Sequence, residues 1–444
     1  MPKTLRQLGQ DLQSGRSTAT SLVQEKLDLL GKLEPKLQAF THIDADRALK
    51  HAAAIDKLRS AGVDLGPLMG IPVAVKDLFT IDGMPTSAGT RVDVQDLVPA
   101  QGGFVQMLFR AGCIVLGKTR TSEFALGGYN PSHVLPWNPC DDKVKRMTGG
   151  SSHGSAVAMA AGLAGFTVGS DTGGSVRWPA ALCGVVGYKS TTNHWPTDGV
   201  FPLSPQLDSV GIFTRSVEDA AWVEAALAGR ALGQQQSVSS LKLALPQFHF
   251  MENLDDAVST CFHQAIEMLR NAGASITEIH VPEASEIDDI FRCLVPADLL
   301  AFLGRARVQE HEKLIDPVAN ARLGGAVDLR ADEYVRMASR LLHLQQLITE
   351  RYPQFDAWIT PTVPQVPAPI EAFSTVQSIA DWNRLATQNT RPGNLFNQCG
   401  ISMPIQHLGA ALPVGLQLCA APGADATLLR VAMAVESCLG PSTN

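Results

Sequence analysis

Residues 70–77 read GIPVAVKD, and this short stretch decides the fold class. A glycine is followed by an apolar, partly β-branched run that ends at Lys76-Asp77, which is typical of a buried strand. The chain continues with a helix candidate at 102–112, a second short apolar run at 113–116 and a Gly-Lys-Thr turn. This strand–helix–strand alternation predicts an α/β fold built on a sheet.

The same pattern extends outward from residues 70–77. Apolar spacing predicts helices over 17–31, 45–60 and 424–438, a strand–helix–strand unit over 241–282, a mainly helical cap or insertion over 285–350 and a late strand at 413–418. No tandem repeat or low-complexity linker interrupts the chain, which favours one large domain. Its expected parts are an N-terminal helical region (1–65), a central core (66–240), an α/β segment with the helical cap (241–355) and a C-terminal return to the core (356–444).

Composition excludes several classes of protein. The chain has 444 residues, of which 45% are hydrophobic and 18% charged, so it can bury a large core and is not intrinsically disordered. Its formal net charge is −7, with no run of lysine or arginine, which argues against a nucleic-acid groove or an anionic membrane surface.

Cysteine and histidine usage gives no sign of a metal or cofactor site. The eight cysteines form no CxxC pair, and the eleven histidines show none of the usual metal-ligand spacings. Eight scattered thiols fit a reducing compartment, and the sequence starting Met1-Pro2-Lys3-Thr4 lacks an apolar signal region. We therefore expect a soluble cytoplasmic protein that needs no metal or cofactor.

Two clusters of small residues carry the chemical signal. Residues 148–155 read TGGSSHGS and lead directly into an alanine-rich helix candidate, and residues 169–175 read GSDTGGS. Such clusters are usually turns or linkers. Here, however, glycines let backbone N–H groups converge on one point, and free N–H groups at the start of a helix favour negative charge. An oxyanion that develops during catalysis needs such an arrangement.

A serine nucleophile needs a base, and two candidates exist. Residues 150–154 formally match G-x-S-x-G, which would make Ser152 the nucleophile of an α/β-hydrolase elbow with a histidine as base. The elbow requires a hydrophobic strand immediately before it, whereas residues 143–148 read KVKRMT, which argues against this interpretation. The other candidate base is Lys76, which must be uncharged near pH 7 and therefore buried beside hydroxyls. Asp77 follows directly, but neighbours on a strand point to opposite faces, so it need not pair with Lys76.

Together these stretches resemble the amidase signature family. The resemblance rests on residues 149–155, 169–177 and 179–189, on the lysine strand at 70–77, and on shorter blocks at 116–125, 207–220, 361–362, 413–417 and 426–429. It covers roughly residues 5–440. It implies a single large domain with a central twisted mixed β-sheet flanked by helices on both faces.

The resemblance also implies a Ser-cisSer-Lys triad. Ser175 would attack an amide carbonyl, and Ser151, after a cis peptide bond, would connect Ser175 to the base Lys76. The oxyanion hole would be formed by the backbone N–H groups of Thr172, Gly173, Gly174 and Ser175. Three further residues would support the site: Ser152, Asp171 and Arg177. Asp171 and Arg177 are expected to form a structural ion pair, which would affect catalysis indirectly through the geometry of the loop.

Some positions depart from the family pattern without removing a triad atom. His153 stands where glycine or serine is common, and Trp178 where an aliphatic residue is common; both are more typical of packed side chains than of ligand contacts. The residues expected near the substrate pocket are Tyr129, Asn130, His153 and Arg391.

Two functions of different kinds remain open. The first is an amidohydrolase for a small amide, carbamate (as in urethanases) or urea-type substrate, with no nucleic-acid or membrane partner and a possible homodimer. The second is the glutamine-hydrolysing subunit of a multi-protein amidotransferase or degradation complex. The sequence does not identify the substrate.

Overall fold

A computed structural model describes residues 3–440, and within that range the strands form one mixed sheet of eleven. Their order across the sheet is β1-β3-β2-β4-β6-β5-β10-β11-β9-β7-β8. The strands are β1 (Phe40–Ile43), β2 (Pro72–Lys76), β3 (Ile114–Thr119), β4 (Phe166–Asp171), β5 (Val186–Lys189), β6 (Ser209–Thr214), β7 (Lys242–Pro246), β8 (Ser275–Ile279), β9 (Ala357–Pro361), β10 (Cys399–Pro404) and β11 (Gly415–Ala420).

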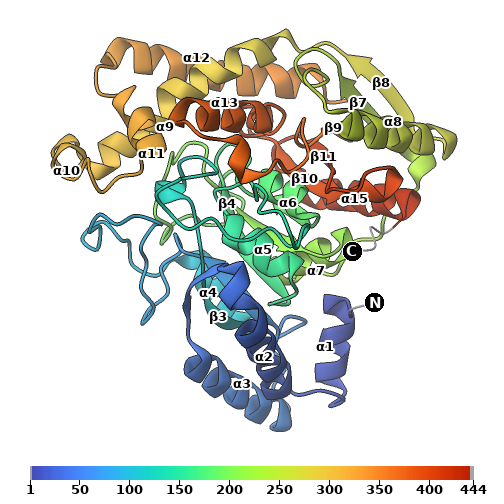
Figure 1. The fold of residues 1–444 in the computed structure, drawn as a ribbon. Coiled ribbons are helices and arrows are strands. Elements are labelled where there is room, and N and C mark those ends of the chain that lie inside the picture. Colours follow the sequence, from blue (N-terminus) through green and yellow to red (C-terminus); the bar gives the residue numbers. More distant parts are fainter. Residues whose placement is uncertain (1–2, 441–444) are drawn as a thin grey trace.

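Fifteen α-helices within residues 3–440 surround this sheet (Figure 1). They are α1 (Leu5–Gln13), α2 (Ala19–Leu37), α3 (Ala45–Ser60), α4 (Gly103–Arg110), α5 (His153–Ala160), α6 (Arg177–Cys183), α7 (Val217–Leu227), α8 (Asp256–Asn271), α9 (Ile287–Leu303), α10 (Arg305–Glu310), α11 (Pro317–Gly324), α12 (Ala331–Arg351), α13 (Val376–Ala386), α14 (Arg391–Leu395) and α15 (Asp425–Leu439). The prediction of an α/β fold with a mixed sheet between helices is confirmed.

The predicted strand–helix–strand units are present with small shifts. The unit expected over 241–282 consists of β7, α8 and β8, with β7 and β8 paired in parallel. The run at 70–76 forms β2, whose five residues are all buried. The central strands β5, β6 and β10 were not predicted, because they are short and each contains a glycine. Such strands resemble loop sequence when tertiary neighbours are unknown.

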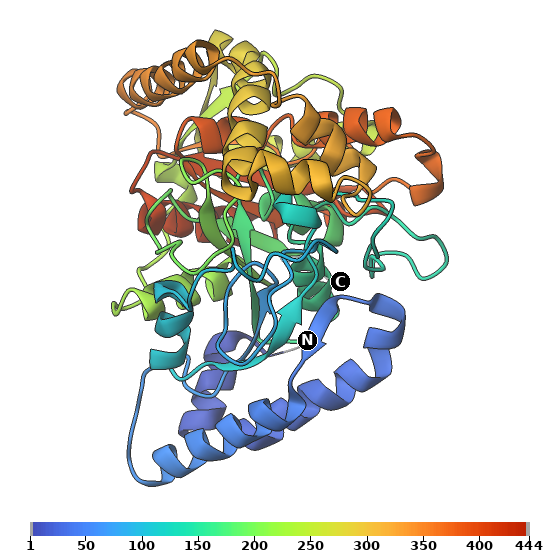
Figure 2. The same ribbon diagram turned by 90° about the vertical axis from the view of Figure 1, so that its left-hand side faces the viewer.

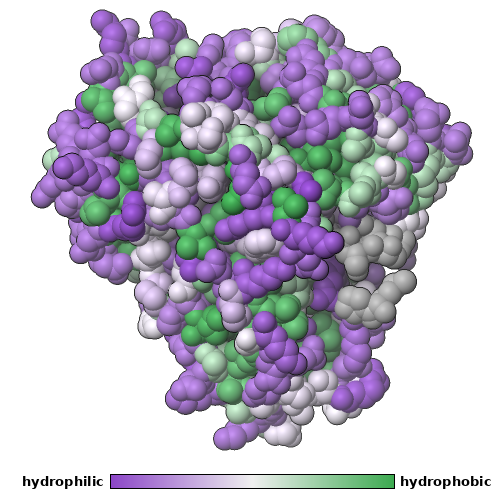
Figure 3. All heavy atoms as spheres, viewed as in Figure 1, coloured by the Kyte–Doolittle hydropathy of each residue, from purple (hydrophilic) through white to green (hydrophobic). Residues whose placement is uncertain are grey.

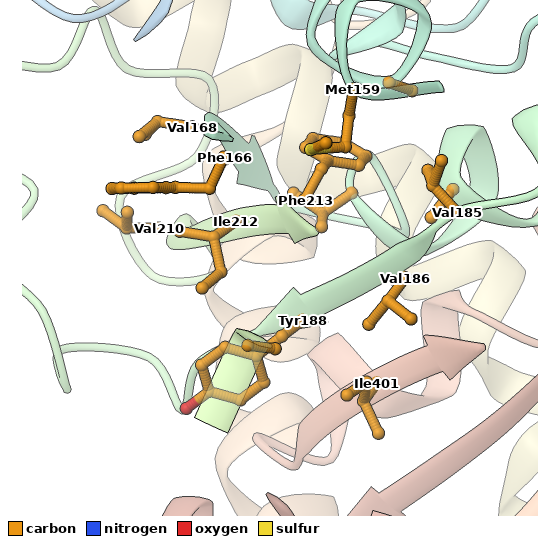
Figure 4. Packing of buried hydrophobic residues seen from close by; sticks show 14 of the residues in the cluster. Met159, Phe166, Val168, Val185, Val186, Tyr188, Val210, Ile212, Phe213 and Ile401 are labelled. Carbon is orange, nitrogen blue, oxygen red and sulfur yellow. The ribbon is translucent and has the colours of Figure 1, made fainter. Parts of the chain in front are cut away.

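The core lies on both faces of the central strands (Figure 4). Met159 of α5 lies near Phe213 of β6 on one face. On the other face, Tyr188 of β5 donates its hydroxyl proton to Asp425 at the start of α15, at 2.6 Å. Burial on both faces explains why β2 reads as a continuous apolar run up to Lys76 rather than an alternating one.

The N-terminal helices and the helical insertion lie at opposite ends of the molecule. Figures 1 and 2 show α2 and α3 at the bottom and the 285–350 segment at the top in both views. The latter contains all of α9, α10 and α11 and most of α12, so it is mainly helical, as expected. No helix among the residues described is both long and apolar enough to cross a membrane. On the face shown in Figure 3, hydrophobic side chains are scattered among polar ones.

Candidate active site

Lys76 lies at the carboxyl end of β2, and the strand topology brings the two small-residue loops to it. β2 pairs in parallel with β4, so the loop that follows Asp171 emerges at the same edge of the sheet as Lys76. This edge is where ligands bind in open α/β sheets. The Lys76 amine, which is fully buried, donates to Ser151 Oγ at 2.7 Å and to Ser170 Oγ at 2.9 Å.

The amine is surrounded by hydroxyl groups rather than by carboxylates. Burial lowers the pKa of Lys76 to about 7, against an opposing effect of the more distant Asp171 and Asp208. Asp77 instead pairs with Lys118, with 2.9 Å between Lys118 Nζ and Asp77 Oδ1. The expectation that Asp77 need not pair with Lys76 is therefore confirmed, and Lys76 has an uncharged population near neutral pH.

Ser151 is buried in the loop that precedes α5, and the Gly150–Ser151 peptide bond is cis. Gly149 has a φ of +70°, and a Cβ there would lie 2.9 Å from Pro179 Cα. Only glycine fits this position without displacing α6. With the loop in this position, the Ser151 hydroxyl lies within hydrogen-bond distance of Lys76 on β2.

The second loop, residues 171–177, is held by an ion pair at its base. Arg177 Nη2 lies 3.0 Å from Asp171 Oδ1, and both side chains are fully buried. Asp171 also accepts the backbone N–H groups of Gly174, Val176 and Arg177. These contacts hold the pKa of Asp171 far below its ordinary value, with the guanidinium as the main cause that opposes the burial penalty. The carboxylate therefore fixes the path of the loop.

Three N–H groups of this loop make no hydrogen bond among the described residues. Within residues 3–440 the N–H groups of Thr172, Gly173 and Ser175 make no hydrogen bond, whereas that of Gly174 donates to Asp171 Oδ1 at 2.7 Å. Gly174 has a φ of +121°, and a Cβ there would lie 2.0 Å from Thr390 Oγ1. Of the four N–H groups predicted for the oxyanion hole, three are thus unbonded, and that of Gly174 is used within the turn.

Ser175 lies in the second loop, and its hydroxyl makes no hydrogen bond to Ser151. The Ser152 N–H donates to the Ser175 carbonyl at 3.3 Å, which ties the loops together. Among the described residues, the Ser175 hydroxyl has no hydrogen-bond partner. The observed chain of contacts therefore runs from Lys76 to Ser151 and ends there. The Ser152 hydroxyl donates to the Ser170 carbonyl at 3.1 Å, and no strand precedes it, which disfavours the nucleophile elbow.

A small cavity of about 30 Å³ adjoins Ser175. It has room for about one water molecule. Loop residues Thr172 and Gly173 form one wall, and the helical cap closes the other with Phe291 of α9 and Arg322 of α11. A much larger cavity, about 910 Å³, lies instead between α7 and α15 and contains none of the predicted site residues.

Of the four predicted pocket residues, the structure places one on this cavity. Arg391 of α14 lines it and forms an ion pair with Asp288. Tyr129 packs against the hydrophobic cluster around Trp178. Asn130 accepts the N–H of Glu123 at 2.9 Å and donates to Asp316, which are structural contacts.

His153 is also buried away from this cavity, at the first position of α5. Burial lowers its pKa to about 3, so the imidazole is uncharged at neutral pH.

Sequence reasoning missed four polar residues near the site. They are Ser170, which binds the Lys76 amine; Asp208, which accepts the Thr172 hydroxyl; and Arg322 and Asn383, which line the cavity. Ser170 stands inside the GSDTGGS stretch, so the small-residue cluster itself could have pointed to it. Asp208 stands in the 207–220 block that carries part of the resemblance, so that block could have pointed to it. Arg322 and Asn383 lie in segments without a motif, so nothing in the sequence marks them.

Comparison with known proteins places these features in a family. The family model described as Amidase matches residues 21–429. The chain is 37% identical over 431 residues to a 2-amino-5-chloromuconic acid deaminase of Comamonas testosteroni, covering 95% of this chain and 93% of that protein. It is 32% identical over 479 residues to one of the subunits of the glutamyl-tRNA(Gln) amidotransferase of Salinispora tropica, covering 97% and 96%.

Solved structures of amidases share the fold of this chain. A crystal structure of an amidase superimposes with a TM-score of 0.89 at 29% identity, covering 99% of this chain and 100% of the other. The native peptide amidase of Stenotrophomonas maltophilia superimposes with a TM-score of 0.82 at 28% identity, covering 98% and 96%.

Proposed function

This chain belongs to the Amidase family, and we propose that it cleaves the C–N bond of a small-molecule substrate through an acyl-enzyme on Ser175. The chain is an amidase, a hydrolase acting on C–N bonds. The proposal concerns the roles of its individual residues in that reaction. The observation that carries it is the 2.7 Å hydrogen bond between the Lys76 amine and Ser151 Oγ in a fully buried setting.

In the proposed first half-reaction, the Ser175 oxygen attacks the substrate carbonyl carbon. Its proton passes to Ser151 Oγ while the Ser151 proton passes to the uncharged Lys76 amine. Closing this relay requires the Ser175 hydroxyl to turn toward Ser151 as substrate enters. The negative charge on the carbonyl oxygen is stabilised by the free N–H groups at residues 172, 173 and 175.

Collapse of the tetrahedral intermediate breaks the C–N bond, and Lys76 returns the proton through Ser151 to the leaving nitrogen. Water then attacks the acyl-enzyme by the same relay in reverse, which releases the acid and restores Ser175. Only side chains, backbone N–H groups and water take part. Removing either Lys76 or Ser151 interrupts both half-reactions.

The leaving group is the open part of the proposal. Primary amides, carbamates and urea-type substrates all present a carbonyl bonded to nitrogen, and all fit the relay. The Comamonas relative is named for an amino-substituted unsaturated acid, which adds compounds of that kind to the candidates. A panel of primary amides, anilides, carbamates, carboxylated ureas and aminomuconic acids, tested on the purified chain, distinguishes them.

A second candidate is a subunit that works only with a partner protein. The 32% identity to a component of an amidotransferase supports it, as does a solved relative described as part of a vestigial protein complex, with a TM-score of 0.87 at 26% identity. Release of ammonia or amine by the isolated chain favours the free-standing enzyme. A chain that reacts with a fluorophosphonate at Ser175 but hydrolyses nothing alone favours the partner-dependent role. Cytoplasmic location and a homodimer remain predictions, the latter testable by light scattering.

The decisive experiment is covalent trapping. A fluorophosphonate is expected to label Ser175, and Lys76→Ala is expected to abolish this labelling while Asp77→Asn is not. Labelling at Ser152 instead would overturn the role assignments and revive the nucleophile elbow.

A further inference from the structure

The cavity beside Ser175 has a positively charged wall with no carboxylate in it. Arg322 and Arg391 line the cavity, and none of its lining residues is aspartate or glutamate. Asp288 binds Arg391 from outside the cavity and also lies 3.7 Å from Arg384. Asp288 therefore pairs directly with two arginines, and Arg322 makes no direct ion pair among the described residues.

Arg322 is a cation without a partner. Within residues 3–440 its guanidinium makes no hydrogen bond and no ion pair, although α11 places it against the cavity. Burial, with a further effect of the positive charge on Arg391, lowers its pKa to about 10, against an opposing effect of Asp288. It remains charged at neutral pH, so a buried guanidinium has no hydrogen-bonded anion beside it, an arrangement that an anionic ligand relieves.

Asn383 of α13 is an unsatisfied amide at the same place. Its side chain is only 5% exposed, and neither Oδ1 nor Nδ2 has a hydrogen-bond partner among the described residues. Leaving a buried polar group unpaired costs about 1–3 kcal/mol, so each such group calls for an explanation. Arg391 Nε is likewise buried and unpaired.

These polar groups converge on one point. A Cβ at Gly127, which has a φ of +101°, would lie 3.3 Å from Arg322 Nη1 and 3.5 Å from Asn383 Nδ2. Gly127 itself lines the cavity that contains Ser175. The two nitrogen atoms thus aim at the same small volume beside the nucleophile.

The three residues also form the boundary to a larger space. A second cavity of about 670 Å³ is lined by the cap helices and α13, and it shares Arg322, Asn383 and Arg391 with the inner one. Its wall carries both signs of charge, with Asp289, Glu333 and Asp381 beside the arginines. A substrate entering through it passes these residues before it reaches Ser175.

We propose that Arg322, Asn383 and Arg391 bind a carboxylate of the substrate, so that the enzyme acts on amides that carry a free acid group. This inference rests on the proposed function, because it describes the substrate of the same site. A guanidinium presents two parallel N–H donors to a planar carboxylate, and the Asn383 amide adds a third.

The test compares matched pairs of substrates. Monoamides of dicarboxylic acids with two to five carbons between the carbonyl groups are set against neutral amides of the same length, and the ratio of kcat/KM values is measured. The wild type is expected to prefer the acid by about 100-fold or more, since a charged hydrogen bond contributes about 1.5–3 kcal/mol. Equal use of both members would overturn the proposal.

Variants assign the preference to residues. Arg322→Gln should reduce the ratio by about 50-fold, chiefly through KM for the acid, and Arg322→Lys should restore part of it. Asn383→Asp keeps the shape and adds a negative charge, so it should shift the preference toward neutral amides. The matched control is Arg292→Gln, which removes a charge from the outer cavity alone and should leave the ratio within about threefold. A ratio that is unchanged in Arg322→Gln, or reduced equally in the control, refutes the site.

A binding measurement separates this proposal from the proposed function. Calorimetry on the Ser175→Ala variant with glutarate and glutaramate should show binding that is lost with an additional Arg322→Gln change. If the wild type hydrolyses nothing but this Arg322-dependent binding is found, the carboxylate site stands and the catalytic proposal fails. If neutral amides are hydrolysed and neither acid binds, the reverse holds.

Discussion

Replacing Ser170 by alanine should move the pH dependence of catalysis without removing a triad residue. Ser170 Oγ accepts a hydrogen bond from the Lys76 amine at 2.9 Å, and both groups are buried. The other partners of the amine are Ser151 Oγ at 2.7 Å and the Ser170 carbonyl at 3.5 Å. Alanine at 170 therefore deletes one of the two short contacts of the amine and keeps the backbone one.

The size of the effect follows from the charge of the donor. A hydrogen bond from a charged group contributes about 1.5–3 kcal/mol, and one from a neutral group about 0.5–1.5 kcal/mol. Losing the contact thus disfavours the ammonium relative to the free amine by roughly 1–1.5 kcal/mol, which corresponds to about one pKa unit. Because burial already lowers the pKa of Lys76 to about 7, the variant should titrate near pH 6, by the same approximate conversion.

The sign is fixed by the role of the amine as base. The relay needs uncharged Lys76, so kcat/KM of the wild type should rise with pH and level off above about 7. In Ser170→Ala the rising limb should move about one unit toward acid, by the same reasoning. The assay is kcat/KM against pH from about 5 to 9 for one primary amide.

Two controls make the result interpretable. Ser170→Thr retains the hydroxyl and should keep the wild-type limb. Ser190→Ala removes another buried serine that donates to a strand carbonyl, at 2.8 Å from Val210 O, and should not move it. A limb that stays in place in Ser170→Ala, or moves toward alkaline pH, would show that Lys76 is not the group that titrates.

Four further outcomes are expected. Ser175→Ala should lower kcat by at least about 10³-fold and leave the unfolding free energy within about 0.5 kcal/mol, as judged by urea titration; retained turnover would exclude Ser175 as nucleophile. Arg177→Met strands the buried Asp171 carboxylate, so the unfolding free energy should fall by about 3–5 kcal/mol, and a loss below about 1 kcal/mol would mean that the pair does not hold the loop. Lys76→Met should be more stable than the wild type at pH 7. The pKa of Lys76 is about 7 in the folded wild type, below the ordinary value of 10.5, so between these pH values the unfolded wild type binds more protons than the folded one. The unfolding free energy of the wild type therefore rises with pH in this range, and the difference in unfolding free energy between the two proteins should narrow. Asn383→Leu removes the unsatisfied amide and should raise the melting temperature while it weakens the preference for acidic amides; a lower melting temperature would argue that the amide is satisfied in solution.

For the helical insertion, the sequence predicts the secondary structure but not the contacts with the site. The sequence predicted that 285–350 is helical, because its apolar residues recur at helical spacing. It did not predict which residues face Ser175. Phe291 and Arg322 reach the cavity only because α9 and α11 pack over the loop at 171–177.

The pocket prediction illustrates the same limit. Tyr129 and Asn130 were expected near the substrate because of the family resemblance, and the structure places Asn130 in a buried network with Glu123 and Asp316. Asp316 lies far along the chain, on the segment that leads into α11. A sequence alone does not pair residues that are so distant in the chain.

The sequence by itself determined the α/β class, the family resemblance and the candidate triad of Lys76, Ser151 and Ser175. These features are local, because apolar periodicity, glycine placement and motif order can each be recognised within short segments of the chain. Tertiary structure alone decided that Gly174 gives its N–H to Asp171, that Ser170 contacts the Lys76 amine, and that an unpaired arginine and asparagine meet beside the nucleophile. The physical reason is that hydrogen-bond partners and electric fields depend on distance in space, which a long chain sets only when its sheet is assembled.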